Sequence, residues 1–327
     1  MVKCAPDCYS MSMDIRHLRY FVAIAEEGTI SKAALRLRVA QPALSLQLRK
    51  LEAELGSELL HRTARGVSVT ASGAKLLTHA RDIIHRIDSA REDVQGAAPQ
   101  PTGSVILGMS QSVAMMLCTP LIQQMLDEFP GIRLRICESN TGHIPEFVRS
   151  GRLDLGVVFR LDEGQELVSR AVIEEDLYLV GPRMEGDEPQ VELAELAMLP
   201  MILPGRPHSL RELIVESMRR ENVSLNIVAE VDAIPQIKEL VAVGLGYTIL
   251  SHASVRPELE TGRLVARRIA SPSITRSVIF CRSAACSPSR ALQTVEATAC
   301  EIVSRLVRGG SWLARLLPGS ANRLPPT

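Results

Sequence analysis

Apolar residues recur at helical spacing in three short segments at the start of the chain. The first segment, residues 14–27, ends at Gly28, and its apolar face consists of Leu18, Phe21, Val22 and Ala25. In the second segment Ser31 is placed to cap a helix in which Ala33 and Ala34 pack against a neighbour. A tight turn separates this helix from the third, and the arrangement predicts a helix-turn-helix.

The third segment, "QPALSLQLRKLEAELG" (residues 41–56), has one leucine out of pattern. Pro42 suits the first helical position and Gly56 suits the exit. Its apolar stripe consists of Leu44, Leu48, Leu51 and Leu55. Leu46 lies about 200° from Leu44 around the helix, on the face that is expected to be exposed to solvent. An exposed leucine at this position requires a reason.

A hairpin and a long helix follow the three short helices. "SELLHRTARGVSV" predicts a small wing that carries Arg62 and Arg65 at its tip. The next helix, from Ser72 to about Gln95, carries an apolar stripe too broad for a small domain to bury. We therefore expect a second copy of the chain to cover it, as a homodimer. Residues 96–103, "GAAPQPTG", form a linker.

Strands and helices alternate beyond the linker, which predicts an α/β fold with a doubly wound parallel sheet. Strands are predicted at 104–109, 132–139 and 153–159, with helices at 112–129 and 141–150. Residues 168–182 are predicted to form two strands that cross into a second lobe. That lobe is predicted to contain strands 201–204, 225–231 and 247–251 and helices 208–222 and 232–244. Strands 263–269 and 276–282 and the helix 288–308 complete the prediction.

The predicted domains are a winged helix-turn-helix (13–71), a linker helix with its hinge (72–103) and a two-lobed domain (104–308). Residues 309–327 are expected to be a frayed tail. Residues 1–12 match no periodic pattern. They are expected to form a disordered extension, or to follow a start codon upstream of the true one at Met13.

Charge distinguishes the first domain from the rest. The chain is neutral overall, with 37 basic and 37 acidic residues. Between residues 31 and 75, however, eight cations face three acids. This excess fits a surface for a polyanion such as double-stranded DNA, although a solvated helical face is the alternative. The helix-turn-helix and wing favour DNA. The predicted contact residues are Ser31, Lys32, Arg38, Gln41, Pro42, Ser45, Leu46, Arg49, Arg62 and Arg65.

Polar residues follow several predicted strands, where helix N-termini point into the crevice of an α/β sheet. Hydroxyl groups and free backbone N–H groups at such ends suit a small anion, and a carboxylate is the expected effector. Helix capping is the competing role for each residue taken alone. The predicted effector-binding residues are Ser110, Gln111, Ser112, Asn140, Thr141, Phe159, Pro204, His208, Ser209 and Arg211.

Motifs of several other protein classes are absent from the sequence. It has no Walker A motif, no G-x-S-x-G elbow and no H-E-x-x-H motif, and its seven histidines show no metal-ligand spacing. We predict no catalytic residue, metal or cofactor. The seven cysteines form no C-x-x-C pair and are read as reduced thiols that fill the core. No apolar run reaches the ~18 residues of a membrane helix, and a cytoplasmic protein without membrane partners is expected. The alternative, a soluble binding protein or enzyme without a DNA-directed role, leaves residues 14–95 unexplained.

The block "AALRLRVAQPALSLQLRKLEAELGSELLHR" resembles the DNA-binding domain of LysR-type transcriptional regulators. The resemblance extends over about residues 13–308. "HARDII", "EEDLYLVGP" and "LPGRPHSLR" resemble the branch of nitrogen assimilation control regulators. The resemblance implies a winged helix-turn-helix, a linker-helix dimer that assembles into a homotetramer, and a two-lobed effector domain similar to periplasmic binding proteins. The resemblance places Ser112 and Thr141 at positions that commonly touch effector. Our hypothesis for the mechanism is that effector binding shifts the paired DNA-binding domains on two half-sites, which alters DNA bending and, through it, contact with RNA polymerase.

The same resemblance gives Leu46 a role. Related sequences commonly carry Arg or Gln at this position, just after Ser45. We therefore interpret Leu46 as a groove-facing residue where an apolar side chain replaces a polar base reader, which either packs on a thymine methyl group or gives up a contact.

Overall fold

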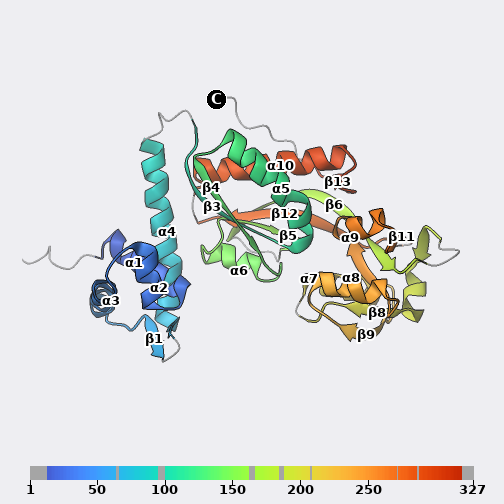
Figure 1. Cartoon of the computed structure of the whole chain (residues 1–327), viewed down its shortest axis with the longest axis horizontal. Coiled ribbons are helices and arrows are strands. Elements are labelled where there is room, and N and C mark those ends of the chain that lie inside the picture. Colours follow the sequence, from blue (N-terminus) through green and yellow to red (C-terminus); the bar gives the residue numbers. More distant parts are fainter. Residues whose placement is uncertain are drawn as a thin grey trace, which may run out of the picture. The chain divides into compact units, whose positions relative to one another are not determined.

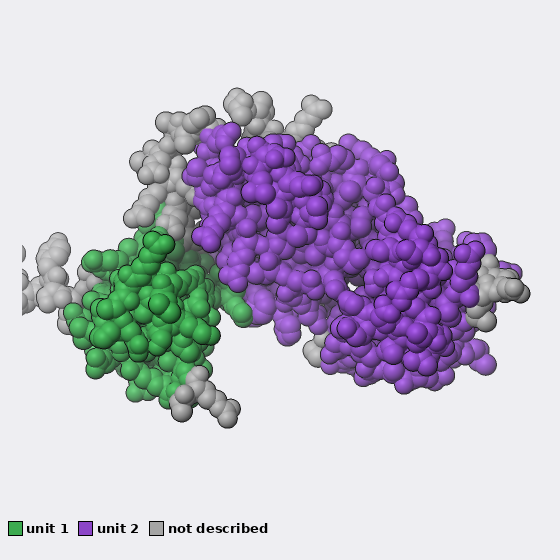
Figure 2. Space-filling model, in the orientation of Figure 1, with its two compact units in different colours: residues 1–98, 150–152 green, residues 99–149, 153–327 purple. Residues whose placement is uncertain are grey.

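A computed structural model describes residues 13–63, 66–94, 100–161, 166–183, 188–206, 208–270, 272–285 and 287–318. The chain divides into two compact units (Figures 1 and 2). One comprises residues 1–98 and 150–152, and the other residues 99–149 and 153–327. Each has its own hydrophobic core. Among the described residues, no helix is sufficiently long and apolar to span a membrane.

The first unit contains the three predicted short helices, the wing and the long helix. Its elements are α1 (Ile15–Glu27), α2 (Ile30–Leu37), α3 (Gln41–Leu55), β1 (Leu60–Thr63), β2 (Gly66–Val69) and α4 (Ala71–Val94). Ala33 and Ala34 are buried, which lets α2 cross its neighbours closely. Phe21, Leu44 and Leu48 fill the core between α1 and α3. The predicted order of elements is therefore confirmed.

The start of α2 differs from the prediction. Thr29, not Ser31, is the N-cap, because its side-chain oxygen accepts from the Lys32 backbone N–H. Gly28 precedes it with φ +67°, a left-handed conformation that ends α1 and lets the new helix begin at once. The Ser31 hydroxyl instead donates to Gln41 Oε1 at 3.2 Å, which links the first turns of α2 and α3.

The wing packs directly against the end of α1. Strands β1 and β2 pair antiparallel, with Leu60 opposite Val69 and Thr63 opposite Gly66. Gly66 has φ +136°, and a Cβ there would come within 2.4 Å of the Gly28 carbonyl oxygen, so only glycine fits. Residues 64 and 65 lie outside the described residues, and Arg65 is among them.

The second unit has two lobes, each with a large hydrophobic core, joined by two strands, and a smaller hydrophobic cluster includes Ile144 and Val148 of the first lobe. The first lobe contains β3 (Gly103–Met109), α5 (Gln111–Glu128), β4 (Ile132–Glu138), α6 (Ile144–Arg149) and β5 (Leu155–Val158). The second contains β7 (Gln190–Glu192), η1 (Leu193–Met198), β8 (Pro200–Leu203), α7 (Ser209–Arg220), β9 (Asn226–Glu230), α8 (Ile234–Ala242), β10 (Thr248–Ser251), α9 (His252–Glu260) and β11 (Val265–Ala270). Helix α10 (Arg290–Arg308) and strand β13 (Arg315–Leu316) return to the first lobe (Figure 1).

The connecting strands are β6 (Leu167–Gly181) and β12 (Thr275–Ser283). In β6, Val172 and Ile173 belong to the first core, whereas Leu177 and Leu179 belong to the second. The prediction of two strands in this segment is therefore wrong, because one 15-residue strand spans both lobes.

The sheet is mixed rather than doubly wound and parallel. β3 pairs parallel with β4 and β5, as predicted. β12 pairs antiparallel with β5 and β6, and β10 and β11 also pair antiparallel with β6. This follows from the connection, since the chain enters the second lobe along β6 and returns along β12 in the opposite direction.

Residues 309–318 pack against the first lobe, which corrects the expectation of a frayed tail for this part of the segment. Trp312 is only 1% exposed. Strand β13 pairs with β6, placing Arg315 opposite Glu174 and Leu316 opposite Ile173. Residues 319–327 lie outside the described part of the chain, as do residues 1–12.

Candidate functional site

The predicted DNA-contact residues gather around α2 and α3. Ser45 is half-buried, whereas the exposed members are Ser31, Lys32, Arg38, Gln41, Pro42, Leu46, Arg49 and Arg62. Leu46 is 46% exposed, while Leu44 and Leu48 are at most 2% exposed. The leucine that breaks the apolar pattern thus lies on the solvent face of α3.

Ion pairs sort the cations of this unit into two groups. Arg36 donates to Glu26 and Glu27, and Arg62 lies 4.0 Å from Glu52. Among the described residues, Lys32, Arg38 and Arg49 form no ion pair. The second group is therefore the one whose charge is uncompensated locally and available to phosphate or base edges.

The N-terminus of α3 also has unfilled hydrogen-bonding capacity. Its N-cap is Ala40, which provides no side-chain acceptor, and Pro42 in the first turn lacks an N–H. The remaining first-turn amides and the positive end of the helix dipole suit an anion such as a DNA phosphate.

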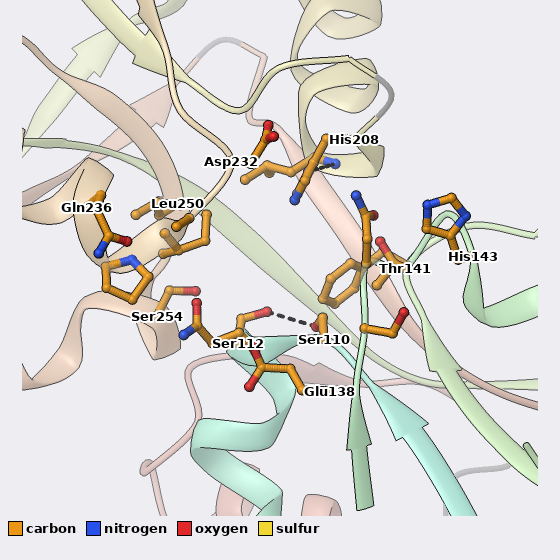
Figure 3. Close-up of a pocket in the computed structure, with 18 of the residues that line it drawn as sticks. Ser110, Ser112, Glu138, Thr141, His143, His208, Asp232, Gln236, Leu250 and Ser254 are labelled. Carbon is orange, nitrogen blue, oxygen red and sulfur yellow. Dashed lines mark hydrogen bonds between the residues drawn. The ribbon is translucent and has the colours of Figure 1, made fainter. Parts of the chain in front are cut away.

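In the second unit a cavity of about 550 Å³ opens between the two lobes. Its lining comes from strand ends, helix starts and the connecting strand β12 (Figure 3). The lining residues are Ser110, Gln111, Ser112, Glu138, Ser139, Asn140, Thr141, His143, Phe159, Arg206, His208, Leu210, Asp232, Ala233, Ile234, Pro235, Gln236, Leu250, Ser254 and Arg276.

Most of the predicted effector residues meet in this cavity, but three do not line it. Pro204 is buried and does not line the cavity. Ser209 does not line it either, but its Oγ contacts Oγ1 of the lining residue Thr141 from the opposite lobe. Arg211 borders a separate hollow between α7 and β9 and donates from Nη2 to Glu230 at 3.2 Å. The structure therefore gives Arg211 a role in packing α7 against β9 rather than in lining the inter-lobe cavity.

Capping explains some of the polar residues at helix starts and not others. Asn140 Oδ1 accepts from the Gly142 backbone N–H, and His208 Nδ1 accepts from that of Leu210. Ser110 is the N-cap of α5, yet its side chain makes no capping bond and instead contacts Ser112 Oγ at 3.2 Å (Figure 3). Ser110 therefore leaves the first-turn amides of α5 uncapped at the cavity wall, and no other described side chain is seen to cap them.

Two arginines line the cavity, the exposed Arg206 and the buried Arg276. Arg276 is 6% exposed, and its Nη2 donates to Ser112 Oγ at 3.1 Å and to Ser251 Oγ at 3.0 Å. Its Nε donates to Glu175 Oε1 at 2.7 Å. The Phe159 ring lies 3.6 Å from the guanidinium carbon and fixes the plane of the group. These contacts orient the Arg276 guanidinium within the cavity wall.

Figure 3 shows His208 and Asp232 on one side of the cavity and Ser110 and Ser112 on the other. Burial lowers the pKa of His208, and the charge of Arg276 lowers it further, against the opposing effect of Asp232. The imidazole is therefore neutral near pH 7. Because its Nδ1 accepts a backbone hydrogen bond, the proton is on Nε2, which serves as a donor.

Two protein-family models match the sequence. The bacterial regulatory helix-turn-helix model of the lysR family matches residues 15–74. The LysR substrate binding domain model matches residues 98–299. The chain belongs to the LysR family of transcriptional regulators.

Relatives of this LysR-type regulator include the nitrogen assimilation regulatory protein nac of Klebsiella aerogenes. The two are 32% identical over 294 residues, which are 90% of this chain and 96% of the relative. The protein of the same name from Escherichia coli is 30% identical over 293 residues, 89% of this chain and 96% of that one. The predicted family is confirmed.

Solved structures show the same fold. Full-length OxyR of Pseudomonas aeruginosa, in a variant form, superposes with a TM-score of 0.75 at 24% identity, covering 90% of this chain and 95% of that one. Full-length CbnR in complex with its target DNA superposes with a TM-score of 0.61 at 22% identity, covering 90% and 99%. The predicted architecture of a helix-turn-helix followed by a two-lobed domain is confirmed.

Sequence reasoning missed the central cation of the regulator's cavity. Arg276 alternates with Val278 and Phe280 on the buried face of β12. A charged residue at every second position with buried apolar residues lies on the same face of a strand as they do, and this pattern could have identified Arg276. The acidic residues Glu138 and Asp232, and Gln236 at the start of α8, were missed as well.

Two of the regulator's cysteines have thiols of low reactivity. Burial raises the pKa of the Cys281 and Cys300 thiols to about 12, so neither is a thiolate near neutral pH. This agrees with the interpretation of these two residues as core thiols. Within the described part of the chain, no group of three or more His, Cys, Asp or Glu side chains is placed to hold a metal ion.

Proposed function

We propose that this LysR-type regulator binds a small carboxylate between its two lobes and that the bound anion changes how its paired DNA-binding domains lie on two half-sites. The change alters DNA bending and, through it, contact with RNA polymerase. The observation that carries the effector class is Arg276, a buried and pre-oriented guanidinium in the wall of a cavity of about 550 Å³.

The rest of the cavity supports an anion. The uncapped N-terminus of α5 and the Nε2 donor of His208 supply further partners for a carboxylate. Asp232 and Glu138 also line the cavity. They favour an effector that carries donors elsewhere in its structure, because a purely anionic molecule would be repelled there.

For DNA, the proposal assigns sequence reading to α3, through Gln41, Ser45, Leu46 and Arg49. Lys32, Arg38 and the wing residues Arg62 and Arg65 contact phosphates on either side, and Arg62 exchanges its 4.0 Å contact with Glu52 for a phosphate. Helix α4 carries Ile83, Ile84 and Ile87 only half-buried, which supports a dimer in which a second copy covers this face. Two such dimers form the proposed tetramer.

A matched pair of probes tests the effector class. Isothermal titration calorimetry compares benzoate with benzamide, and succinate with succinamide, which have similar size but no charge. The proposal expects a carboxylate to bind and its amide not to bind. Equal binding of acid and amide, or binding of neither acid, would refute the carboxylate assignment.

Ser112→Ala separates the two functions of the chain. It removes one of the acceptors that orient Arg276 Nη2 and is expected to weaken carboxylate binding. In a gel-shift assay, basal DNA affinity should stay unchanged, because Ser112 lies in the other unit from α3. Equal loss of both activities would point to misfolding, which circular dichroism would reveal.

A further inference from the structure

The single tryptophan of the chain donates a hydrogen bond to the counter-ion of Arg276. Trp312 Nε1 lies 2.8 Å from Glu175 Oε2, and Glu175 Oε1 lies 2.7 Å from Arg276 Nε. The three side chains are 1%, 2% and 6% exposed, respectively. They form a buried chain of charge-assisted bonds that runs from the C-terminal segment to the wall of the cavity.

The C-terminal segment is fastened on both sides of Trp312. The Trp312 backbone N–H donates to the Leu306 carbonyl at the end of α10, and Ser311 O accepts from Arg256 Nη1. Beyond it, β13 pairs with β6, the strand that carries Glu175. The indole is therefore held in place by the backbone around it.

The indole N–H decides which carboxylate oxygen serves Arg276. Oε1 lies 2.7 Å from both Nε and Nη2 of the guanidinium, whereas Oε2 is engaged by Trp312. Among the described residues, Arg276 Nη1 has no hydrogen-bond partner, and Arg276 lines the cavity. The Nη1 edge is thus left for a ligand.

Without the indole N–H, the buried Oε2 would lack its donor, a costly condition for a charged group. The carboxylate would then turn to bring both oxygens onto Nε and Nη2 of the guanidinium in the stronger bidentate pairing, which compensates the Arg276 charge more fully. An effector carboxylate would have to compete with that tighter counter-ion for Arg276.

We propose that Trp312 is a positioning residue of the effector site: by holding Glu175 Oε2, it prevents a bidentate Glu175 pairing at Nε and Nη2 and so leaves more of the Arg276 charge for an anion at the Nη1 edge. The inference rests on the proposed function, in which the cavity binds a carboxylate. By this inference, the C-terminal segment 309–317 contributes to effector binding, although this segment follows the last helix of the domain.

Trp312→Phe is the direct test, because phenylalanine keeps a buried ring and loses the N–H. Calorimetry with benzoate and with succinate should give a Kd roughly tenfold weaker than that of the wild-type protein, the equivalent of one charge-assisted bond. Ile302→Val is the matched control, since Ile302 is buried in the same core. It should leave the Kd unchanged. A Trp312→Phe protein that binds as the Ile302→Val protein does would overturn the proposal.

A double variant distinguishes positioning from packing. Glu175→Gln removes the charge that Trp312 positions, so adding Trp312→Phe to it should weaken binding no further. If the two changes act independently on the Kd, Trp312 contributes only to packing and the proposal fails.

The tryptophan itself provides a second readout. Because the chain has one tryptophan, 15N-labelled tryptophan gives one indole resonance. Benzoate should shift it, benzamide should not, and Arg276→Lys should abolish the shift. If wild-type protein binds benzoate by calorimetry and the resonance stays in place, the role of Trp312 fails while the carboxylate site stands. If neither benzoate nor succinate binds, the carboxylate site itself fails, and the role of Trp312 with it.

Discussion

Thr141 and Ser209 contact each other through their side-chain oxygens, although they come from opposite lobes of the effector domain. Thr141 follows β4 of the first lobe and is 5% exposed, and Ser209 begins α7 of the second. The contact joins the two lobes beside the cavity.

A double-mutant cycle tests that contact. Thr141→Val and Ser209→Ala should each lower the free energy of unfolding by about 1 kcal/mol, the usual net value of one hydrogen bond. The double variant should lose no more than either single one, because both remove the same bond. Urea denaturation measures all four proteins. Strictly additive losses would show that the two hydroxyl groups act separately.

Leu46 provides a test of groove reading. Because its side chain is 46% exposed, Leu46→Gln should leave the free energy of unfolding within about 0.5 kcal/mol of the wild-type value. It should change the base preference at one position of the operator, as measured by selection from randomised DNA. Leu44→Ala, at a fully buried position of the same helix, should cost about 2–5 kcal/mol. A comparable loss for Leu46→Gln would mean that Leu46 belongs to the core.

Arg49 and Arg36 form a matched pair of exposed arginines. Arg49→Ala should weaken DNA binding by about 1–3 kcal/mol if the side chain reads a base. If it contacts phosphate, the variant should instead reduce the slope of log K against log salt by about one. Arg36→Ala should change neither quantity, because Glu26 and Glu27 already neutralise Arg36. Fluorescence anisotropy at several salt concentrations measures both, and equal effects of the two variants would refute the assignment of α3.

His208 makes stability depend on pH. Its pKa is lowered in the folded protein, mainly by burial, so the unfolded chain binds a proton at a higher pH than the folded one. Stability should therefore fall as the pH drops below about 6.5, the ordinary value, towards the folded pKa. His208→Asn keeps a capping oxygen for the Leu210 amide and should flatten this part of the profile.

Burial also lowers the pKa of His252, so the stability of the His208→Asn protein should still depend on pH to some extent. Urea unfolding at pH 7.5 and pH 5.5 measures the difference. An identical loss in the wild-type and His208→Asn proteins would contradict a neutral His208.

Local patterns in the sequence were enough to predict the first unit. Helical periodicity, Gly28 and Gly56 set the elements, and the exposed position of Leu46 followed from its angle around the helix. The identity of the α2 cap did not follow, because Thr29 and Ser31 are both competent and only the backbone conformation after Gly28 selects between them.

The long-range features of the effector domain could not be predicted in the same way. Glu175 and Arg276 are 101 residues apart, and their pairing depends on β6 and β12 lying side by side. Trp312 is part of a segment whose short strand has no periodicity of its own and forms by pairing with β6. The polar residues at strand ends were predictable because strand ends and helix starts line the crevice of any α/β sheet. The buried charge of Arg276 beside them was not predictable.

The most direct test of the central claim is a footprint of the protein on the DNA upstream of its own gene, extended to genomic fragments if that region is unprotected. The account predicts a protected region with two half-sites, lost with increasing salt, whose extent changes when a carboxylate that binds the cavity is added. No sequence-selective protection at any fragment, or a footprint that a bound carboxylate leaves unchanged, would contradict it.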